Sequence, residues 1–143
     1  MIKVRITKIK DNAVVPHYAH KGDAGVDLYS TEDNTLKPGE RALISTGIKI
    51  AVPKGYEAQV RPRSGLAIKH GISVCNTPGT IDSGYRGEVC VILINHSNEI
   101  FKVEKGMRIA QMIINKVEEV EFEEVDELDS TTRGEGGFGH TGI

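Results

Sequence analysis

Hydrophobic and polar residues alternate in short segments along most of the chain. Alternation of this kind is typical of β-strands that bury one face. Turn signals containing Pro or Gly separate the segments, and only Gly65–His70 has the character of a short helix. The predicted strands are Ile2–Ile6, Ile48–Val52, Tyr56–Val60, Gly71–Asn76, Glu88–Asn95, Ile109–Ile114 and Val117–Val125.

Two of these strands predict a hairpin, because Ile48–Val52 and Tyr56–Val60 flank the turn Pro53-Lys54-Gly55. Many short strands with this turn spacing, without an internal repeat or a strand–helix–strand unit, predict an all-β fold. We expect a sandwich or a jelly-roll type of distorted barrel, with one short helix. The barrel domain should span residues 1–129, followed by a flexible, glycine-rich C-terminal arm over residues 130–143.

Composition agrees with a β fold and narrows the chemistry. The 143 residues include 16 Gly and no Trp, so the core must come mainly from Ile, Val and Leu. No apolar stretch near the start resembles a signal peptide or membrane helix, so we expect a cytoplasmic protein without a membrane partner. Cys75 and Cys90 lack the spacing of a zinc or redox site and are expected to pack as reduced thiols.

Charge is distributed unevenly along the chain. The formal net charge of −2 argues against a nucleic-acid polymer as partner. Eight of the 20 acidic residues lie between Glu118 and Asp129, which leaves 12 acids against 18 bases elsewhere. That remainder favours a small anion as ligand. The acidic run itself is expected to be a solvated edge from which Val120, Phe122 and Val125 point inward.

The last residues contain a misleading motif. Gly134-x-Gly136-x-x-Gly139 matches the dinucleotide-binding fingerprint, but only four residues follow it, which excludes the helix on which that site depends. The same segment contains one cation, Arg133, and one aromatic ring, Phe138, in a backbone too rich in glycine to order itself. We therefore expect this arm to bind a ligand.

Several internal segments contain polar groups suited to phosphate chemistry. Arg61–Gly65 follows a strand and opens the helical stretch, which indicates a phosphate site or an ordinary helix N-cap equally well. Asp82 is either a base that activates water or a side chain that satisfies a turn. Asp27 could face a hydrated magnesium ion. Gln111 interrupts an apolar alternation and either bonds a buried backbone group or reaches the ligand.

Together these segments resemble the trimeric deoxyuridine triphosphate nucleotidohydrolases (dUTPases) over essentially the whole chain. Five motifs in order carry the resemblance. They are Ala24-Gly25-Val26-Asp27-Leu28-Tyr29-Ser30, Arg61-Pro62-Arg63-Ser64-Gly65-Leu66-Ala67, Gly79-Thr80-Ile81-Asp82-Ser83-Gly84-Tyr85-Arg86-Gly87-Glu88, Gly106-Met107-Arg108-Ile109-Ala110-Gln111 and Arg133-Gly134-Glu135-Gly136-Gly137-Phe138-Gly139.

The resemblance implies a dUTPase-like β-clip jelly roll in a homotrimer, with three active sites assembled from all three chains and capped by the arm. It implies hydrolysis of dUTP to dUMP and pyrophosphate, which lowers dUTP and supplies dUMP for thymidylate synthesis. Mg²⁺ would be the cofactor, held mainly by the triphosphate. The host would be a bacterium or a phage-infected cell.

The resemblance also assigns roles to residues. Asp82 would activate the water that attacks the α-phosphorus and contact the 3′-hydroxyl, Asp27 would reach Mg²⁺ through water, and Tyr85 would pack on the deoxyribose. In the arm, Arg133 would neutralise the γ-phosphate and Phe138 would stack on uracil. Uracil would be recognised by Asn76, Gly79, Thr80 and Ile81, and the phosphates by Arg63, Ser64, Gly65, Gln111, Gly139 and Thr141.

Two positions depart from the family pattern, and two other functions compete. His140 stands where many relatives have Ser, and Gly84 replaces a common Asp. A deoxycytidine triphosphate deaminase shares the fold but requires a different acid/base site. A non-catalytic nucleotide-binding regulator would be expected to lack Asp82, which is present. The sequence therefore favours dUTP hydrolysis.

Overall fold

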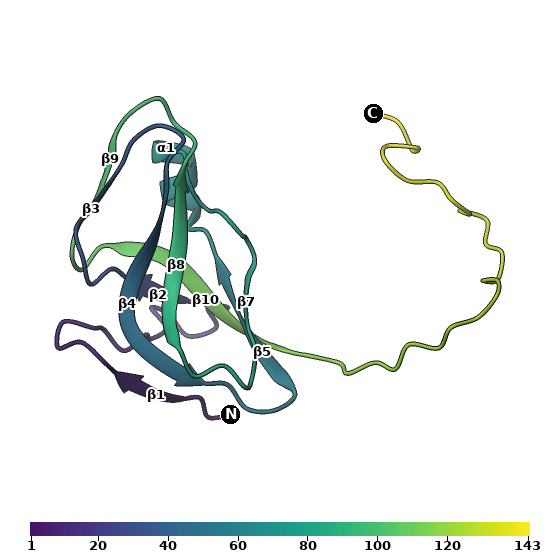
Figure 1. Cartoon of the computed structure of the whole chain (residues 1–143), viewed down its shortest axis with the longest axis horizontal. Helices are drawn as coiled ribbons and strands as arrows, with labels where there is room; N and C mark the ends of the chain where they lie inside the picture. The colour runs from purple at the N-terminus through teal and green to yellow at the C-terminus, as the bar shows by residue number, and fades with distance from the viewer.

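The computed structural model describes all 143 residues, which form three antiparallel sheets and one short helix (Figure 1). The first sheet has the order β1-β4-β8-β6, with β1 (Arg5–Lys8), β4 (Arg41–Ala51), β8 (Glu88–Asn95) and β6 (Ile72–Val74). The second has the order β2-β10-β5-β7, with β2 (Val26–Tyr29), β10 (Arg108–Lys116), β5 (Tyr56–Arg61) and β7 (Gly79–Ile81). The third pairs β3 (Asn34–Leu36) with β9 (Phe101–Val103), and the helix is α1 (Ser64–His70).

Alternating side chains of the sheets build one apolar core. In β8 every second residue is buried, and Val91 and Leu93 are wholly inaccessible to solvent. Burial of one face against another layer is what an alternating strand requires. The core consists almost entirely of aliphatic side chains, with Phe101 as its one aromatic member. The all-β expectation and the aliphatic core are confirmed.

The predicted hairpin across Pro53–Gly55 is wrong, although both of its strands exist. β4 pairs with β1 and β8, whereas β5 pairs with β10 and β7. The turn therefore carries the chain from the first sheet to the second. Both strands alternate because each buries one face in the shared core, and that pattern does not specify which strand is the neighbour.

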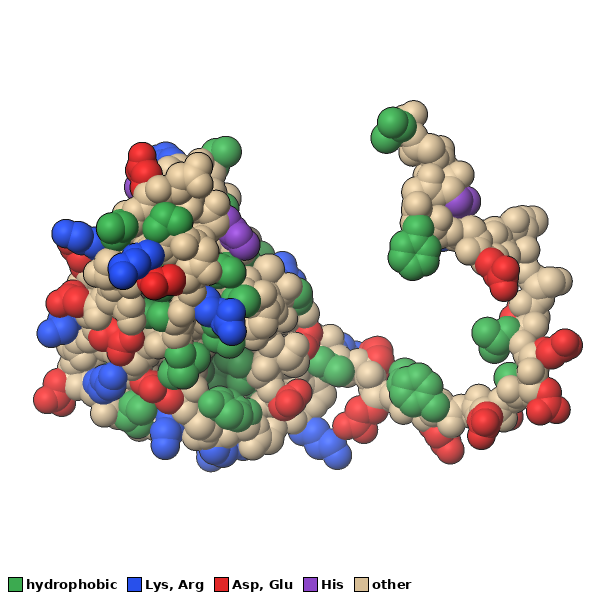
Figure 2. Space-filling view, turned by 45° about the horizontal axis from the view of Figure 1, so that its top comes forward, with side chains coloured by type: hydrophobic (Ala, Val, Ile, Leu, Met, Phe, Trp, Pro, Cys, Tyr) green, Lys and Arg blue, Asp and Glu red, His purple; other side chains and the backbone are tan.

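The predicted strand Val117–Val125 is absent as well. The last strand ends at Lys116, and residues 117–143 lead away from the sheets as an extended segment (Figure 1). Val120, Phe122 and Val125 are exposed rather than directed inward. Acidic side chains line this segment on either side of the exposed phenylalanine (Figure 2). The N–H of Val117 still donates to the carbonyl of Gly55 at 2.9 Å, but the segment beyond it pairs with no strand of its own chain.

No helix of the structure is long and apolar enough to cross a membrane.

Candidate active site

The connection from β5 to α1 presents the predicted phosphate-binding residues. Arg63 occupies the N-cap position in an extended conformation, and no side chain caps the helix. Ser64 is the first helical residue and Gly65 the second, and both are exposed. Ser64 therefore does not serve as the N-cap, the alternative that its position had suggested. Its hydroxyl and the neighbouring backbone N–H groups lie at the surface beside Arg63.

Asp27 of β2 lies at the centre of a cluster with two arginines. Arg63 Nε donates a 3.0 Å hydrogen bond to Asp27 Oδ1, and Arg108 Nη1 lies 3.6 Å from Oδ2. Arg63 also donates to the backbone carbonyl of Arg108 at 3.3 Å. The carboxylate remains 25% exposed, so it is reachable from solvent. Two cations against one anion leave an excess of positive charge, which suits phosphate oxygens.

Gln111 joins this cluster through the sheet. Within β10 it stands opposite Asp27 on one side and Arg61 on the other. Its Nε2 donates a 2.9 Å hydrogen bond to the carbonyl of Pro62, so the amide satisfies a backbone group, one of the two roles considered for it. A Cβ at Gly25 would lie only 2.9 Å from its Oε1. The amide is thus enclosed between the loop before β2 and the segment that carries Arg63.

A second group of predicted residues lines a pocket of about 330 Å³ near the β7–β8 loop (Asp82–Gly87), which connects the second sheet to the first. Asn76 lies directly beside Gly79, where an added Cβ would be 3.2 Å from its amide nitrogen. The pocket thus combines amide, hydroxyl, carboxylate and aromatic groups with apolar walls. Its lining is Leu43, Asn76, Thr80, Ile81, Asp82, Tyr85, Glu88, Val89, Cys90 and Ile92.

The Asp82 side chain makes no hydrogen bond within the β7–β8 loop. The turn is closed by its backbone carbonyl, which accepts from the amide of Tyr85 at 3.1 Å. The carboxylate is exposed at the pocket and has no cationic partner. Satisfying the turn, the simpler explanation of this residue, therefore does not account for its side chain. Tyr85 lies three residues further along, 45% exposed.

The structure does not bring the arm to either group of residues. Arg133 folds back on its own segment, where its Nε donates to the carbonyl of Gly136 at 2.9 Å. Phe138 is fully exposed and has a positive φ of 50°. Gly139 and Thr141 are exposed in the same terminal stretch, which lies far from the sheets in Figure 1.

The chain is similar to known proteins over almost its whole length. A family model for dUTPase matches residues 11–142. The chain belongs to the dUTPase family. It is 61% identical over 142 residues to the deoxyuridine 5′-triphosphate nucleotidohydrolase of Clostridium novyi (strain NT), covering 99% of this chain and 100% of that protein. It is 58% identical over 143 residues to the corresponding protein of Clostridioides difficile, covering 100% of both.

Solved dUTPase structures share the fold. The dUTPase of Staphylococcus bacteriophage 80alpha with dUpNHpp superposes with a TM-score of 0.92 at 30% identity, covering 100% of both chains. A variant dUTPase from phage phi11 of S. aureus, whose structure shows a coordinated structural Mg(II) ion, superposes with a TM-score of 0.84 at 25% identity, covering 90% of this chain and 100% of that one. These matches confirm the jelly-roll expectation, and they establish the chain as a dUTP diphosphatase, an enzyme that hydrolyses dUTP.

One residue of this dUTPase enters the site without having been singled out. Arg108 lies within the fourth motif and shares the Asp27 carboxylate with Arg63, yet the sequence analysis assigned it no role. A residue three positions before Gln111 faces the opposite side of a regular strand, so alternation gave no signal for Arg108; the register of β10 against β2 shifts between Arg108 and Ala110. Only the pairing of β10 with β2 shows that the side chain reaches Asp27.

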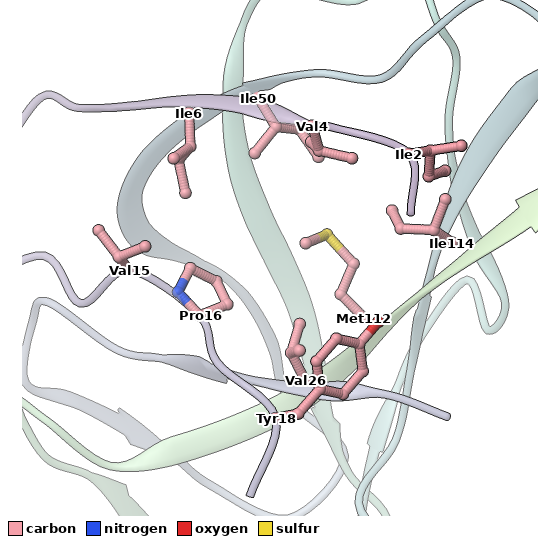
Figure 3. Close-up of a pocket in the computed structure, with 10 residues that line it drawn as sticks. All are labelled: Ile2, Val4, Ile6, Val15, Pro16, Tyr18, Val26, Ile50, Met112 and Ile114. Carbon is pink, nitrogen blue, oxygen red and sulfur yellow. The ribbon is translucent and has the colours of Figure 1, made fainter. Parts of the chain in front are cut away.

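The most apolar hollow of this dUTPase lies elsewhere. It measures about 300 Å³ and is lined by the N-terminal segment Ile2–Ile6, by the segment Val15–Tyr18 and by residues of β2, β4 and β10 (Figure 3). Nine of its ten lining residues are hydrophobic, so it offers phosphate groups nothing to bind. Its lining is Ile2, Val4, Ile6, Val15, Pro16, Tyr18, Val26, Ile50, Met112 and Ile114.

The two cysteines of this dUTPase differ, and the expectation that both are packed is wrong for Cys75, which is exposed. Cys90 is half-buried on β8. Burial raises the pKa of its thiol to about 12, assisted by the hydrogen bond to Glu88 and by the charge of that carboxylate. Because the thiolate is the nucleophile, Cys90 stays protonated and unreactive over the whole neutral range.

We predict that iodoacetamide at pH 8 alkylates Cys75 and leaves Cys90 unmodified. The reason is the raised pKa of Cys90, which keeps its thiol protonated until the pH approaches 12. Peptide mass spectrometry after timed quenching measures both sites in the same sample. The urea-unfolded protein is the control, in which both thiols should react, and equal rates in the folded protein would contradict the prediction.

Proposed function

We propose that this dUTPase converts dUTP to dUMP and pyrophosphate by attack of an Asp82-activated water on the α-phosphorus. The observation that carries the proposal is the Asp82 carboxylate, exposed at a pocket rim with no hydrogen bond and no cation to occupy it. A carboxylate in this state can accept a proton from water as a general base. The reaction removes dUTP and supplies dUMP for thymidylate synthesis.

The nucleoside is bound in the pocket beside the β7–β8 loop. Asn76 and the backbone of Gly79–Ile81 offer donors and acceptors to the uracil edge, and the close contact of Asn76 with Gly79 supports a narrow slot there. Tyr85 packs against the deoxyribose, where an aromatic ring leaves no room for a 2′-hydroxyl. Asp82 contacts the 3′-hydroxyl from the same side.

The phosphates are held by the other group of residues. Arg63, Ser64 and Gly65 supply a guanidinium, a hydroxyl and backbone N–H groups at one exposed turn. Gln111 anchors the carbonyl of Pro62 and so holds this turn against β10. Charge-assisted hydrogen bonds from guanidinium to phosphate are among the stronger polar interactions available to a protein. The excess cation beside Asp27 supports this assignment.

The donor set around Asp27 fits Mg²⁺. One partly exposed carboxylate together with triphosphate oxygens and waters is the environment that Mg²⁺ prefers, since it keeps several waters and uses few protein ligands. Asp27 would hold the ion through water while Arg63 and Arg108 keep the carboxylate in place. Bound there, Mg²⁺ would neutralise phosphate charge and orient the chain of phosphates.

Within one chain the two groups of residues lie too far apart to form this site. Asp27 is on β2 and Asp82 follows β7, with β10 and β5 between them. Three strand spacings of about 4.8 Å give a separation of about 14 Å across the sheet. The register adds to it, because Gln111 pairs with Asp27 and Arg61 at one level while Ile81 pairs with Ala58 at another. We infer that neighbouring chains of a homotrimer contribute the two halves.

Exposed apolar surface supports such an assembly. Leu43 is 63% exposed on the outer face of β4, next to the half-buried Ile92 and Ile94 on β8. The apolar hollow of Figure 3 adds a second surface of this type. Exposed patches of this kind mark protein–protein contacts. The Leu43 surface also borders the nucleoside pocket, so a neighbouring chain seated there would meet the substrate.

The arm of residues 130–143 acts as a mobile cap. Arg133 would neutralise the γ-phosphate, Phe138 would stack on uracil, and Gly139 and Thr141 would bond the phosphates. The full exposure of Phe138 and the reach of the extended segment support closure over the site of a neighbouring chain. Closing a lid of this kind excludes water and completes the set of binding groups.

We predict that Asp82→Asn binds dUTP but hydrolyses it about 100- to 10,000-fold more slowly, the range typical for loss of a general base. The amide keeps the size of the side chain and cannot accept the proton. Pyrophosphate release gives kcat, and calorimetry with the non-hydrolysable analogue dUpNHpp gives affinity. Asp11→Asn, a change at another exposed aspartate, is the matched control. Near-normal turnover of Asp82→Asn would mean that the base lies elsewhere.

Mixing two inactive variants should restore activity if neighbouring chains share sites. Asp82→Asn and Arg63→Ala are each inactive, but co-refolded mixtures contain sites that draw an intact Asp82 from one chain and an intact Arg63 from another. Equal mixing should restore up to about one quarter of wild-type turnover, because one site in four is then complete. Recovery must appear only after co-refolding. No recovery in assemblies shown by mass spectrometry to be mixed would refute shared sites.

Removing residues 133–143 should leave the fold intact and reduce kcat/KM for dUTP roughly tenfold or more, because the cap supplies a cation, a stacking ring and shielding from water. Circular dichroism and size-exclusion chromatography should match the full-length protein, since these residues contact no strand. A double substitution, Arg133→Ala with Phe138→Ala, tests the same groups in a full-length arm. Full activity of both variants would show that the arm is dispensable.

A further inference from the structure

The position of Tyr85 in the β7–β8 loop depends on two residues that follow it, Gly87 and Glu88. Its ring is 45% exposed, so burial alone does not hold it. Its hydroxyl donates a 2.9 Å hydrogen bond to the backbone carbonyl of Glu88. The ring lies against Gly87, where an added Cβ would collide with the phenol oxygen and lie 2.5 Å from Cζ. Any side chain at position 87 would therefore displace the ring.

A bulge in β4 prepares a binding place for the Glu88 side chain. Ser45 pairs with Cys90, but the next paired residues are Lys49 and Glu88, so three residues of β4 stand opposite one residue of β8. Gly47 within this bulge has a φ of 70°, a left-handed conformation that glycine adopts without strain. Within the bulge the backbone N–H of Gly47 does not join the β4–β8 ladder and is free to bind a side chain of β8.

The Glu88 carboxylate fills that place. One oxygen, Oε1, accepts from Gly47 N–H at 3.0 Å and from Ser45 Oγ at 2.5 Å. Ser45 Oγ in turn accepts from Lys10 Nζ at 2.8 Å. The side chain of Glu88, the first residue of β8, therefore binds β4 at the point where the β7–β8 loop ends.

The charge of Glu88 strengthens this tie. Burial raises the pKa of its carboxyl, but hydrogen bonds from Ser45, Cys90 and Gly47 and the charge of Lys10 outweigh burial and lower the pKa overall. The carboxylate is consequently ionised at neutral pH, and hydrogen bonds to an ionised acceptor are stronger than neutral ones.

We propose that Gly87 and Glu88 are positioning residues that hold the Tyr85 ring in place and thereby determine the preference for deoxyribose over ribose. Glu88 fixes the carbonyl that binds the Tyr85 hydroxyl, and Gly87 provides the flat backbone surface on which the ring rests. The inference rests on the proposed contact of Tyr85 with the deoxyribose. It assigns a function to a network that runs from Lys10 through β4 to the end of the β7–β8 loop.

The test compares kcat/KM for dUTP and for UTP in wild type and in Tyr85→Ala, Glu88→Ala, Glu88→Gln and Gly87→Ala. The dUTP-to-UTP ratio should fall about fivefold or more in Glu88→Ala, which is the factor that loss of one hydrogen bond typically produces. Gly87→Ala should lower the ratio as well. Glu88→Gln keeps an oxygen that can accept both bonds and should retain most of the ratio.

A variant that is merely destabilised provides the control. Val103→Ala removes a buried side chain in β9, outside the β7–β8 loop, and should reduce stability without changing the dUTP-to-UTP ratio of kcat/KM. Crystal structures of Glu88→Ala and Gly87→Ala with dUpNHpp give a readout that is independent of turnover. In both, the Tyr85 ring should leave the surface at position 87.

The outcomes separate this inference from the proposed function. An unchanged ratio in Tyr85→Ala would overturn the contact of Tyr85 with the sugar and the inference with it. A reduced ratio in Tyr85→Ala with an unchanged ratio in Glu88→Ala would overturn the inference alone. An equal loss in Glu88→Gln and Glu88→Ala, or an unmoved ring in the crystal structures, would overturn it too.

Discussion

The pairing of β5 with both β10 and β7 is the constraint on which the arrangement of the site depends. β5 leads into the turn that contains Arg63, and β10 places Gln111 and Arg108 beside that turn. β7, on the other side of β5, leads into the β7–β8 loop that contains Asp82. Because a shift of register by one residue would turn every side chain to the opposite face, these hydrogen bonds determine which groups can meet. They bring together the residues around Asp27 and keep the residues of the β7–β8 loop away from them.

The two halves of the proposed site have opposite electrostatic designs. Around Asp27, charges are neutralised within the chain, and one surplus arginine remains for an anion. Asp82 makes no ion pair, and Arg86 of the same loop donates instead to the backbone carbonyls of Ser83 and Tyr85. Three strand spacings of the second sheet separate the two groups within one chain.

Two elements that alternation predicts, the hairpin across Pro53–Gly55 and the strand Val117–Val125, are absent for the same physical reason. Alternation indicates which face of a strand is buried, but the pairing partner comes from elsewhere in the fold, so Ile48–Val52 and Tyr56–Val60 were joined in a hairpin that does not exist. Val117–Val125 alternates like a strand but pairs with no strand of its own chain. Of the four three-residue strands, only β6 lies within a predicted strand, Gly71–Asn76, while β3, β7 and β9 were not predicted.

The sequence by itself determined the fold class, the helix after Arg63 and the chemical groups of the five motifs, because local patterning and residue type decide these. The tertiary structure decided the partners: Arg108 and Arg63 on one carboxylate, Glu88 in the bulge at Gly47, and the distance between Asp27 and Asp82. The three contacts join residues 36, 41 and 81 positions apart in the chain. Their geometry follows from strand order and register, which depend on packing of the whole core and not on any one segment.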